Sequence, residues 1–143
     1  MIKLVLSVAA AVAMLGIFGP SVAQTLSEGE QAQELESLKV YFGRGSARVD
    51  PEQRATLDQA ARLFREGSPI VMIVAGGADT TGAAAANLEL SVDRAQAVVD
   101  GLVARGIPAE RLQLLGRGTS ELAVDTGDGV DSSENRIVEI TWR

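Results

Sequence analysis

Apolar residues in the middle of this chain recur with a helical spacing. Four of them follow one another at i, i+3, i+4 and i+7, as in the buried stripe of an amphipathic helix: Leu57, Ala60, Ala61 and Phe64. The expected start has Asp50 as N-cap, Pro51 at the first helical position and Gln53 three residues after the cap. Gly67 is expected to stop this helix.

A second helix is predicted by the same periodicity further along the chain. Its apolar stripe consists of Ala95, Val98, Val99 and Leu102. Gly106 provides the stop signal, and Pro108 just beyond it cannot continue a helix.

Four segments predict β-strands: Lys39–Phe42, Ile70–Ala75, Arg111–Leu115 and Arg136–Trp142. The second is continuously apolar, which is typical of a central strand covered on both faces. In the last, Val138, Ile140 and Trp142 share one face of the strand, so that face should meet the core. The order βαβαββ predicts an α/β sandwich in which two helices pack on a small mixed four-stranded sheet.

The first 23 residues have the pattern of a secretory signal peptide. Lys3 gives a positive start, Leu4–Phe18 is an apolar run, and Ser21–Ala23 is a small-x-small cleavage site. The alternative is an uncleaved membrane anchor, although the apolar run is shorter than the roughly 20 residues that a spanning helix needs. Residues 24–37 are polar and acidic and are expected to form a flexible leader, followed by one domain over residues 38–143.

The composition argues against several kinds of chemistry. The chain has 13 basic and 19 acidic residues and a formal net charge of −6, so nucleic acid is not expected as a partner. It contains no cysteine, which excludes disulfides and zinc–thiolate sites. It also contains no histidine, the commonest general base and metal ligand. We therefore expect no cofactor or metal, and a binding domain rather than an enzyme.

The segment Gly76–Val98 carries the most informative chemistry. It sets one acid, Asp79, and one base, Arg94, around the entrance to the second helix. A carboxylate binds an ammonium and a guanidinium forks onto a carboxylate, so the two side chains suit a zwitterionic ligand. A structural ion pair without any ligand is the alternative.

The spacing of these two charges constrains the helix. In a helix continuous from about Ala83, Arg94 would lie roughly 16 Å along the axis, too far to share a small ligand with an acid at the helix start. The chain is therefore expected to turn back near Leu90, with Ser91 as N-cap of the main helix. Both charges should then face one hollow that is open to solvent.

Other signals are weaker. Gly76–Gly82 lacks the Lys-Ser/Thr pair of a phosphate-binding loop. Asp125 and Asp128 lie in the expected loop Thr119–Glu134, and because their spacing does not give the regular oxygen set of a calcium site, a solvated loop is favoured. No pair of carboxylates is placed across a groove by recognisable spacing, which argues against a glycan-cleaving hydrolase.

Four separated motifs occur in the order found in a known family: GGADTTG, NLELSVDRAQAVV, LVARGIPAERLQLLGRG and ENRIVEI. With these motifs, the chain from about Leu38 to Trp142 resembles the OmpA-like C-terminal domain, a peptidoglycan-binding module of bacterial envelopes. The resemblance implies that Asp79 and Arg94 clamp the ammonium and carboxylate at the free end of a diaminopimelate residue in the peptidoglycan stem peptide. The binding it implies is noncovalent, and no reaction follows.

Three further residues belong to the predicted ligand-binding set. The resemblance implies Asn87 as a polar residue lining the pocket, and Thr81 and Arg136, which lie in the matching motifs, are included with it. Arg136 either braces the pocket or pairs with a nearby surface acid.

Four positions depart from the family's pattern and remove polar or aromatic groups near the inferred pocket: Gly77, Ala78, Ala86 and Ile137. The leading hypothesis is a periplasmic module that binds diaminopimelate-type peptidoglycan and tethers an envelope component, with an outer-membrane or envelope-complex protein as a further partner. The alternative is a protein-interaction or structural module that keeps the fold after losing wall binding.

Overall fold

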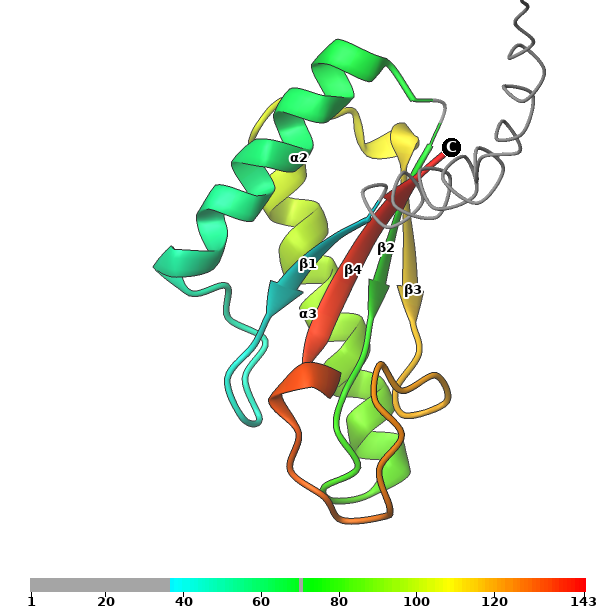
Figure 1. The fold of residues 1–143 in the computed structure, drawn as a ribbon. Helices are drawn as coiled ribbons and strands as arrows, with labels where there is room; N and C mark the ends of the chain where they lie inside the picture. Colours follow the sequence, from blue (N-terminus) through cyan, green and yellow to red (C-terminus); the bar gives the residue numbers. More distant parts are fainter. Residues whose placement is uncertain (1–36, 70) are drawn as a thin grey trace, which may run out of the picture. The chain divides into compact units, whose positions relative to one another are not determined.

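The computed structural model describes residues 37–69 and 71–143. Four strands form one sheet: β1 (Ser37–Tyr41), β2 (Met72–Gly76), β3 (Leu112–Gly116) and β4 (Ile137–Trp142). The strand order is β1-β4-β2-β3, with β4 antiparallel to both neighbours and β2 parallel to β3. Two helices, α2 (Arg54–Gly67) and α3 (Ala84–Val103), lie on the same side of the sheet (Figure 1). The predicted fold class is confirmed.

The amino-terminal expectations fall mostly outside this part of the chain. The predicted signal peptide, residues 1–23, and residues 24–36 of the predicted leader are not among the described residues. β1 already begins at Ser37, one residue before the expected domain boundary, because Ser37 pairs with Thr141 of β4. Among the described residues, no helix has the length and apolar character needed to cross a membrane.

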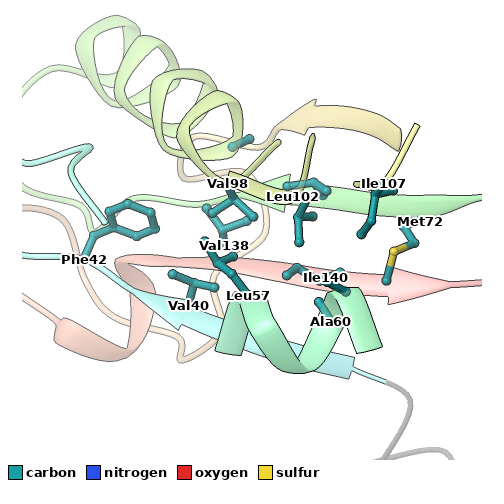
Figure 2. Packing of buried hydrophobic residues seen from close by; sticks show 13 residues of the cluster. Val40, Phe42, Leu57, Ala60, Met72, Val98, Leu102, Ile107, Val138 and Ile140 are labelled. Carbon is teal, nitrogen blue, oxygen red and sulfur yellow. The ribbon is translucent and has the colours of Figure 1, made fainter. Parts of the chain in front are cut away.

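The hydrophobic core lies between the sheet and the two helices (Figure 2). Its fully buried side chains come from three strands and both helices: Val40, Ala60, Met72, Val74, Val98, Leu102, Val138 and Ile140. Trp142 packs against this cluster, so Val138, Ile140 and Trp142 meet the core as the alternation along β4 predicts. Each large side chain contributes about 1.5–3 kcal/mol by leaving water, and together they hold α2 and α3 on this face.

β2 is a central strand, as its apolar sequence predicts, but the expected cover on both faces is wrong at Ile73. Both helices pack on the face that carries Met72 and Val74, so Ile73 points away from them and stays half-buried. On the same outer face, Ala75 lines a small cavity together with Leu122 of the loop after β3. A loop rather than a helix therefore covers part of this face.

The helical turns begin at Pro51, as the sequence predicts, but Pro51–Gln53 form a short 3-10 turn and α2 itself begins at Arg54. Asp50 accepts the hydrogen bond of the Gln53 backbone N–H through its carbonyl, at 2.9 Å, and its side chain makes no capping hydrogen bond. Gln53 Oε1 instead accepts a hydrogen bond from the backbone N–H of Tyr41 at 3.0 Å. Asp50 is thus the N-cap residue, as predicted, but its side chain does not cap, and Gln53 joins the helix start to the end of β1.

α3 approaches β2 very closely at Gly76. A Cβ atom on Gly76 would lie 1.9 Å from Ser91 O and 3.3 Å from Ala95 Cβ. Only glycine allows this contact, so the end of β2 lies beside the middle of α3 rather than beside its first turn. The loop after β2 therefore begins level with Ser91 and returns to the start of α3 at Ala84.

Candidate ligand-binding site

Three loops meet at one end of the sheet (Figure 1). They follow β1, β2 and β3 and comprise residues 42–50, 77–83 and 117–136. β4 starts at the same end because it runs antiparallel to β1 and β2. The five residues predicted to bind a ligand all lie in these loops or on α3.

Asp79 is the buried centre of the polar cluster in these loops, with 4% of its surface exposed. Its Oδ1 accepts hydrogen bonds from the hydroxyl and the backbone N–H of Thr81. Its Oδ2 accepts hydrogen bonds from Arg136 Nη1 at 3.0 Å and from the backbone N–H of Ser132 at 3.3 Å. Both carboxylate oxygens are therefore bound by donors of the protein itself.

These donors keep Asp79 ionised. Burial alone would raise the pKa of Asp79, but hydrogen bonds from Thr81, Arg136 and Ser132 outweigh burial and lower the pKa from 3.8 to about 2. The side chain is a carboxylate at neutral pH, and a cation that replaced one of the donors would meet a full negative charge.

Arg136 links Asp79 to the protein surface through alternating charges. Its Nη1 contacts Asp131 Oδ1 as well as Asp79 Oδ2, and its Nε donates to Phe42 O at 3.1 Å. Asp131 also pairs with the exposed Arg44 at 3.7 Å. The sequence left two roles open for Arg136, and the structure shows both contacts: it pairs with Asp79 and also with the half-exposed Asp131.

Arg94 is fully buried and directs its guanidinium at backbone carbonyls. Nε donates to Ser46 O at 2.8 Å, Nη1 to Gly77 O at 3.0 Å, and Nη2 to Gly43 O at 3.2 Å. The guanidinium carbon also lies 5.5 Å from the centre of the Phe42 ring. Arg94 therefore joins the loop after β1 to the loop after β2.

Arg94 and Asp79 interact through space. Burial lowers the pKa of Arg94 to about 10, the charge of Asp79 acts in the opposite direction, and the charge of Arg136 adds to the lowering. Arg94 stays protonated at pH 7. In the part of the chain that the structure describes, no nitrogen–oxygen distance of 4 Å or less joins Arg94 to Asp79, whose direct ionic partner is Arg136.

The predicted break in the second helix is wrong. α3 runs without interruption from Ala84 to Val103, and Ser91, the expected N-cap, is fully buried in its middle. The Ser91 hydroxyl accepts a hydrogen bond from the backbone N–H of Gly118 at 2.8 Å. The loop with the acid starts beside the middle of the helix, so Arg94 reaches Gly77 without any turn in α3.

The expected hollow, open to solvent at both charges, is also wrong. Asp79 is 4% exposed and Arg94 is 0% exposed. The loop after β1 covers Arg94 because its carbonyls accept from the guanidinium, and the loop after β3 covers Asp79 through Ser132 and Arg136. The site is closed by the same hydrogen bonds that satisfy its charges.

A cavity of about 380 Å³ lies next to this cluster, at the start of α3. Its lining includes Thr80, Gly82, Asn87, Thr119, Asp128 and Gly129. Asn87 is 7% exposed and belongs to both regions, since its Nδ2 donates to Thr81 O at 2.8 Å while the Thr81 hydroxyl holds Asp79. The structure thus brings Asp79, Thr81, Asn87 and Arg136 into one hydrogen-bonded group. Arg94 lies outside this group and binds Gly77 O, two residues before the acid.

Thr80 fastens the loop that borders this cavity. Its Oγ1 donates to Gly127 O at 2.6 Å and accepts from the backbone N–H of Val130 at 2.9 Å. Its carbonyl accepts from the backbone N–H of Gly129 at 2.9 Å. Residues 126–130 are thereby held against the loop after β2.

Replacing Thr80 by valine is expected to loosen this loop without unfolding the domain. Valine keeps the side-chain volume but removes the hydrogen bonds of the hydroxyl, so the free energy of unfolding should fall by about 1 kcal/mol. Amide hydrogen exchange should become faster at Val130, whose backbone N–H loses its acceptor, and stay unchanged in β4. Equal exchange at Val130 in both proteins would contradict this role.

The residues that complete the cluster were missed by the sequence reasoning. Ser132 and Asp131 were assigned to a solvated loop, although they come shortly before Arg136 in the chain. The carbonyls of Gly43 and Ser46 had no detectable signal, because any residue has a backbone carbonyl.

No candidate metal site is found in residues 37–69 and 71–143, where no three or more acidic side chains come together in a way that could hold a metal ion.

The strand order and the two helices on one face define the class of OmpA-like domains. The peptidoglycan-associated lipoprotein from Burkholderia pseudomallei superposes with a TM-score of 0.67 at 24% identity, over 73% of this chain and 89% of that one. The OmpA-like domain of FopA1 from Francisella tularensis gives 0.65 at 19% identity, over 75% and 73%. The cell wall anchor of the T6SS from Pseudomonas aeruginosa gives 0.62 at 26% identity, over 86% and 96%.

Sequence comparison leads to the same class. The chain belongs to the OmpA family, whose sequence model matches residues 41–136. It is 31% identical to "Probable lipoprotein YiaD" from Escherichia coli K12 over 102 residues, 71% of this chain and 47% of that protein. It is 36% identical to Outer membrane protein A from Escherichia coli O157:H7 over 106 residues, 71% of this chain and 29% of that protein. The chain thus spans less than half the length of these curated relatives.

Proposed function

We propose that this domain binds peptidoglycan noncovalently and tethers an envelope component to the cell wall. The proposal rests on Asp79, a carboxylate that stays ionised although buried, beside a cavity that Asn87 lines. Family membership supports it, because two structural relatives are named as a peptidoglycan-associated lipoprotein and a cell wall anchor.

The ligand group that suits this charge arrangement is the free end of diaminopimelate in the stem peptide. That end carries an ammonium and a carboxylate on one carbon atom. Asp79 offers the negative charge for the ammonium. Arg94, which binds the Gly77 carbonyl two residues before the acid, offers the positive charge for the carboxylate. Asn87, Thr81 and Arg136 complete the proposed set as polar groups around the acid.

Binding at these residues requires local opening of the loops. A ligand ammonium would replace Arg136 or the Ser132 N–H on Asp79, and a ligand carboxylate would replace one carbonyl on Arg94. Each step exchanges one charge-assisted hydrogen bond for another, so no buried charge is left unpaired at the end. The loops after β1 and β3 are the parts that must move.

The domain would act on the periplasmic side of the envelope, exported by a signal peptide that is then cleaved. The relatives include outer-membrane proteins by name, so an outer-membrane or envelope-complex protein is the proposed second partner. Their names describe an outer-membrane protein, a lipoprotein and a wall anchor, which supports binding without a subsequent reaction.

The second candidate is a protein-interaction module that has lost wall binding. The complete burial of Arg94 favours it, because all three guanidinium nitrogens already donate to backbone carbonyls. The small residues Gly77 and Ala78 beside Asp79 favour it as well, since they offer no side-chain polar group to a ligand.

Titration with a diaminopimelate-containing stem peptide distinguishes the two candidates. We expect backbone amide chemical shifts of Asp79, Thr81 and Asn87 to move at millimolar peptide. Asn87→Ala should weaken the affinity about five- to tenfold, because one polar contact is lost. Gln59→Ala, an exposed change on α2, should leave the affinity unchanged. An absence of shifts around Asp79 in the wild-type protein would favour the interaction module.

A further inference from the structure

We infer that the loop after β1 is a second contact for the cell wall, in which Arg44 and Arg48 bind carboxylates of the stem peptide outside the Asp79 pocket. This inference rests on the proposed function and adds the part of the ligand that the pocket does not hold. The two arginines lie in residues 43–48, the β1 loop, which is the first part of the connection that follows β1.

The β1 loop is a built structure rather than a loose connection. The buried guanidinium of Arg94 donates to two of its carbonyls, those of Gly43 and Ser46. The Ser46 backbone N–H donates to Gly43 O at 3.1 Å, and Ser46 Oγ accepts from the Arg48 backbone N–H at 3.0 Å. Binding in the Asp79 pocket would displace only the Gly43 carbonyl from Arg94, so the Ser46 contact and the two hydrogen bonds of Ser46 remain. A loop that stays ordered in this way loses less conformational entropy when a ligand docks.

Residues 43–48 carry positive charges only, and the exposed acid Asp50 lies two residues beyond Arg48. Arg44 and Arg48 are both exposed, and the β1 loop contains no acidic residue. Arg44 has one surface partner, Asp131, at 3.7 Å, with 70% of the Arg44 side chain exposed. An exposed pair at this distance is weak, so a ligand carboxylate can take its place. This basic loop stands out in a chain whose formal net charge is −6.

The contact between Arg44 and Asp131 places Arg44 at the rim of the proposed pocket, and Arg48 follows on the same loop. Asp131, the partner of Arg44, is next to Ser132, whose N–H holds Asp79. Arg136 contacts both Asp131 and Asp79. A stem peptide with one end at Asp79 therefore has the Arg44 guanidinium at the edge of the same cluster, with Arg48 four residues further on the same loop, and we infer that both bind its remaining carboxylates.

Arg94 has a positioning role in this arrangement. Burying a guanidinium is costly, and here its hydrogen bonds fix the loop that carries Arg44 and Arg48. The inner arginine orders the β1 loop, and the two outer arginines contact the ligand.

The test compares two stem peptides that contain diaminopimelate, one with its remaining carboxylates free and one with them amidated. We expect the wild-type protein to bind the free form about five- to tenfold more tightly at low salt, and the preference to shrink as salt is added. The variant Arg44→Gln/Arg48→Gln should bind both forms equally. The matched control Arg62→Gln/Arg65→Gln removes the same charge from exposed positions on α2 and should keep the preference.

Any of four outcomes would overturn the inference. If Arg44→Gln/Arg48→Gln keeps the preference for free carboxylates, or if the wild-type protein shows none, the Asp79 pocket stands without this second contact. If the α2 control loses the preference to the same extent, the effect comes from net charge rather than from the β1 loop. If the wild-type protein binds neither peptide, the proposed function fails, and this inference fails with it.

Discussion

Arg94→Met is expected to lower the free energy of unfolding by about 3–5 kcal/mol. The methionine fills similar space but donates no hydrogen bond, so the carbonyls of Gly43, Ser46 and Gly77 lose a buried partner. The loops after β1 and β2 also lose their common attachment. Urea unfolding of the two proteins at pH 7 measures the difference.

Two comparison variants show whether the effect belongs to the buried guanidinium. Arg94→Lys keeps the charge, but a compact ammonium cannot match the planar fork that reaches three carbonyls, so it should recover only part of the loss. Arg62→Met makes the same chemical change at an exposed site on α2 and should stay within about 0.5 kcal/mol of wild type. An Arg94→Met protein as stable as Arg62→Met would contradict the assigned hydrogen bonds.

Asp79→Asn is expected to abolish peptidoglycan binding and to lower the free energy of unfolding at neutral pH by about 2–3 kcal/mol. The amide keeps the shape of the side chain but removes the charge that pairs with Arg136 and faces Arg94. A ligand ammonium would then meet a neutral group.

The stability difference between wild type and Asp79→Asn should depend on pH in a defined direction. The pKa of Asp79 is about 2 in the folded protein and 3.8 without its partners. The stabilisation is therefore fully present above pH 3.8 and is lost as the pH falls through about 2. Unfolding measured at pH 7, 4 and 2 should show the two proteins converging at the lowest pH. A constant difference down to pH 2 would rule out the charge as its source.

The fold was predictable from the sequence because its signals are local. The i, i+3, i+4, i+7 stripe on α2 and the two-residue alternation on β4 each depend on neighbours in the chain. The exceptions arose where a side chain bonds to a distant element. Gln53 binds the backbone of Tyr41 rather than Asp50, and Ser91 binds Gly118 from the middle of a helix.

The sequence indicated which residues lie close together at the candidate site, but not how they are arranged. One hydrogen-bonded group contains four residues from the motifs that the sequence analysis singled out: Asp79, Thr81, Asn87 and Arg136. The position of Arg94 could not be foreseen, because it depends on the close contact between β2 and α3 at Gly76, a tertiary feature. Its partners are backbone carbonyls, which no sequence pattern distinguishes.

Closure of the site changes what the two charges are expected to do. In the solvent-exposed hollow that the sequence predicted, Asp79 and Arg94 would have no protein partners before a ligand binds. Here each is already satisfied, Asp79 by Arg136 and Arg94 by two loops. In the proposed binding mode, a ligand would therefore exchange partners with these groups as the loops open, and its affinity would depend on the stability of those loops as well as on the ligand.

Co-sedimentation with diaminopimelate-type peptidoglycan tests the central claim most directly. The wild-type protein and Asp58→Asn, a control at an exposed acid on α2, should both be found in the pellet. Asp79→Asn should stay in the supernatant at a temperature where circular dichroism shows it folded. Equal sedimentation of Asp79→Asn and wild type, or no sedimentation of the wild-type protein, would contradict peptidoglycan binding through the Asp79 site.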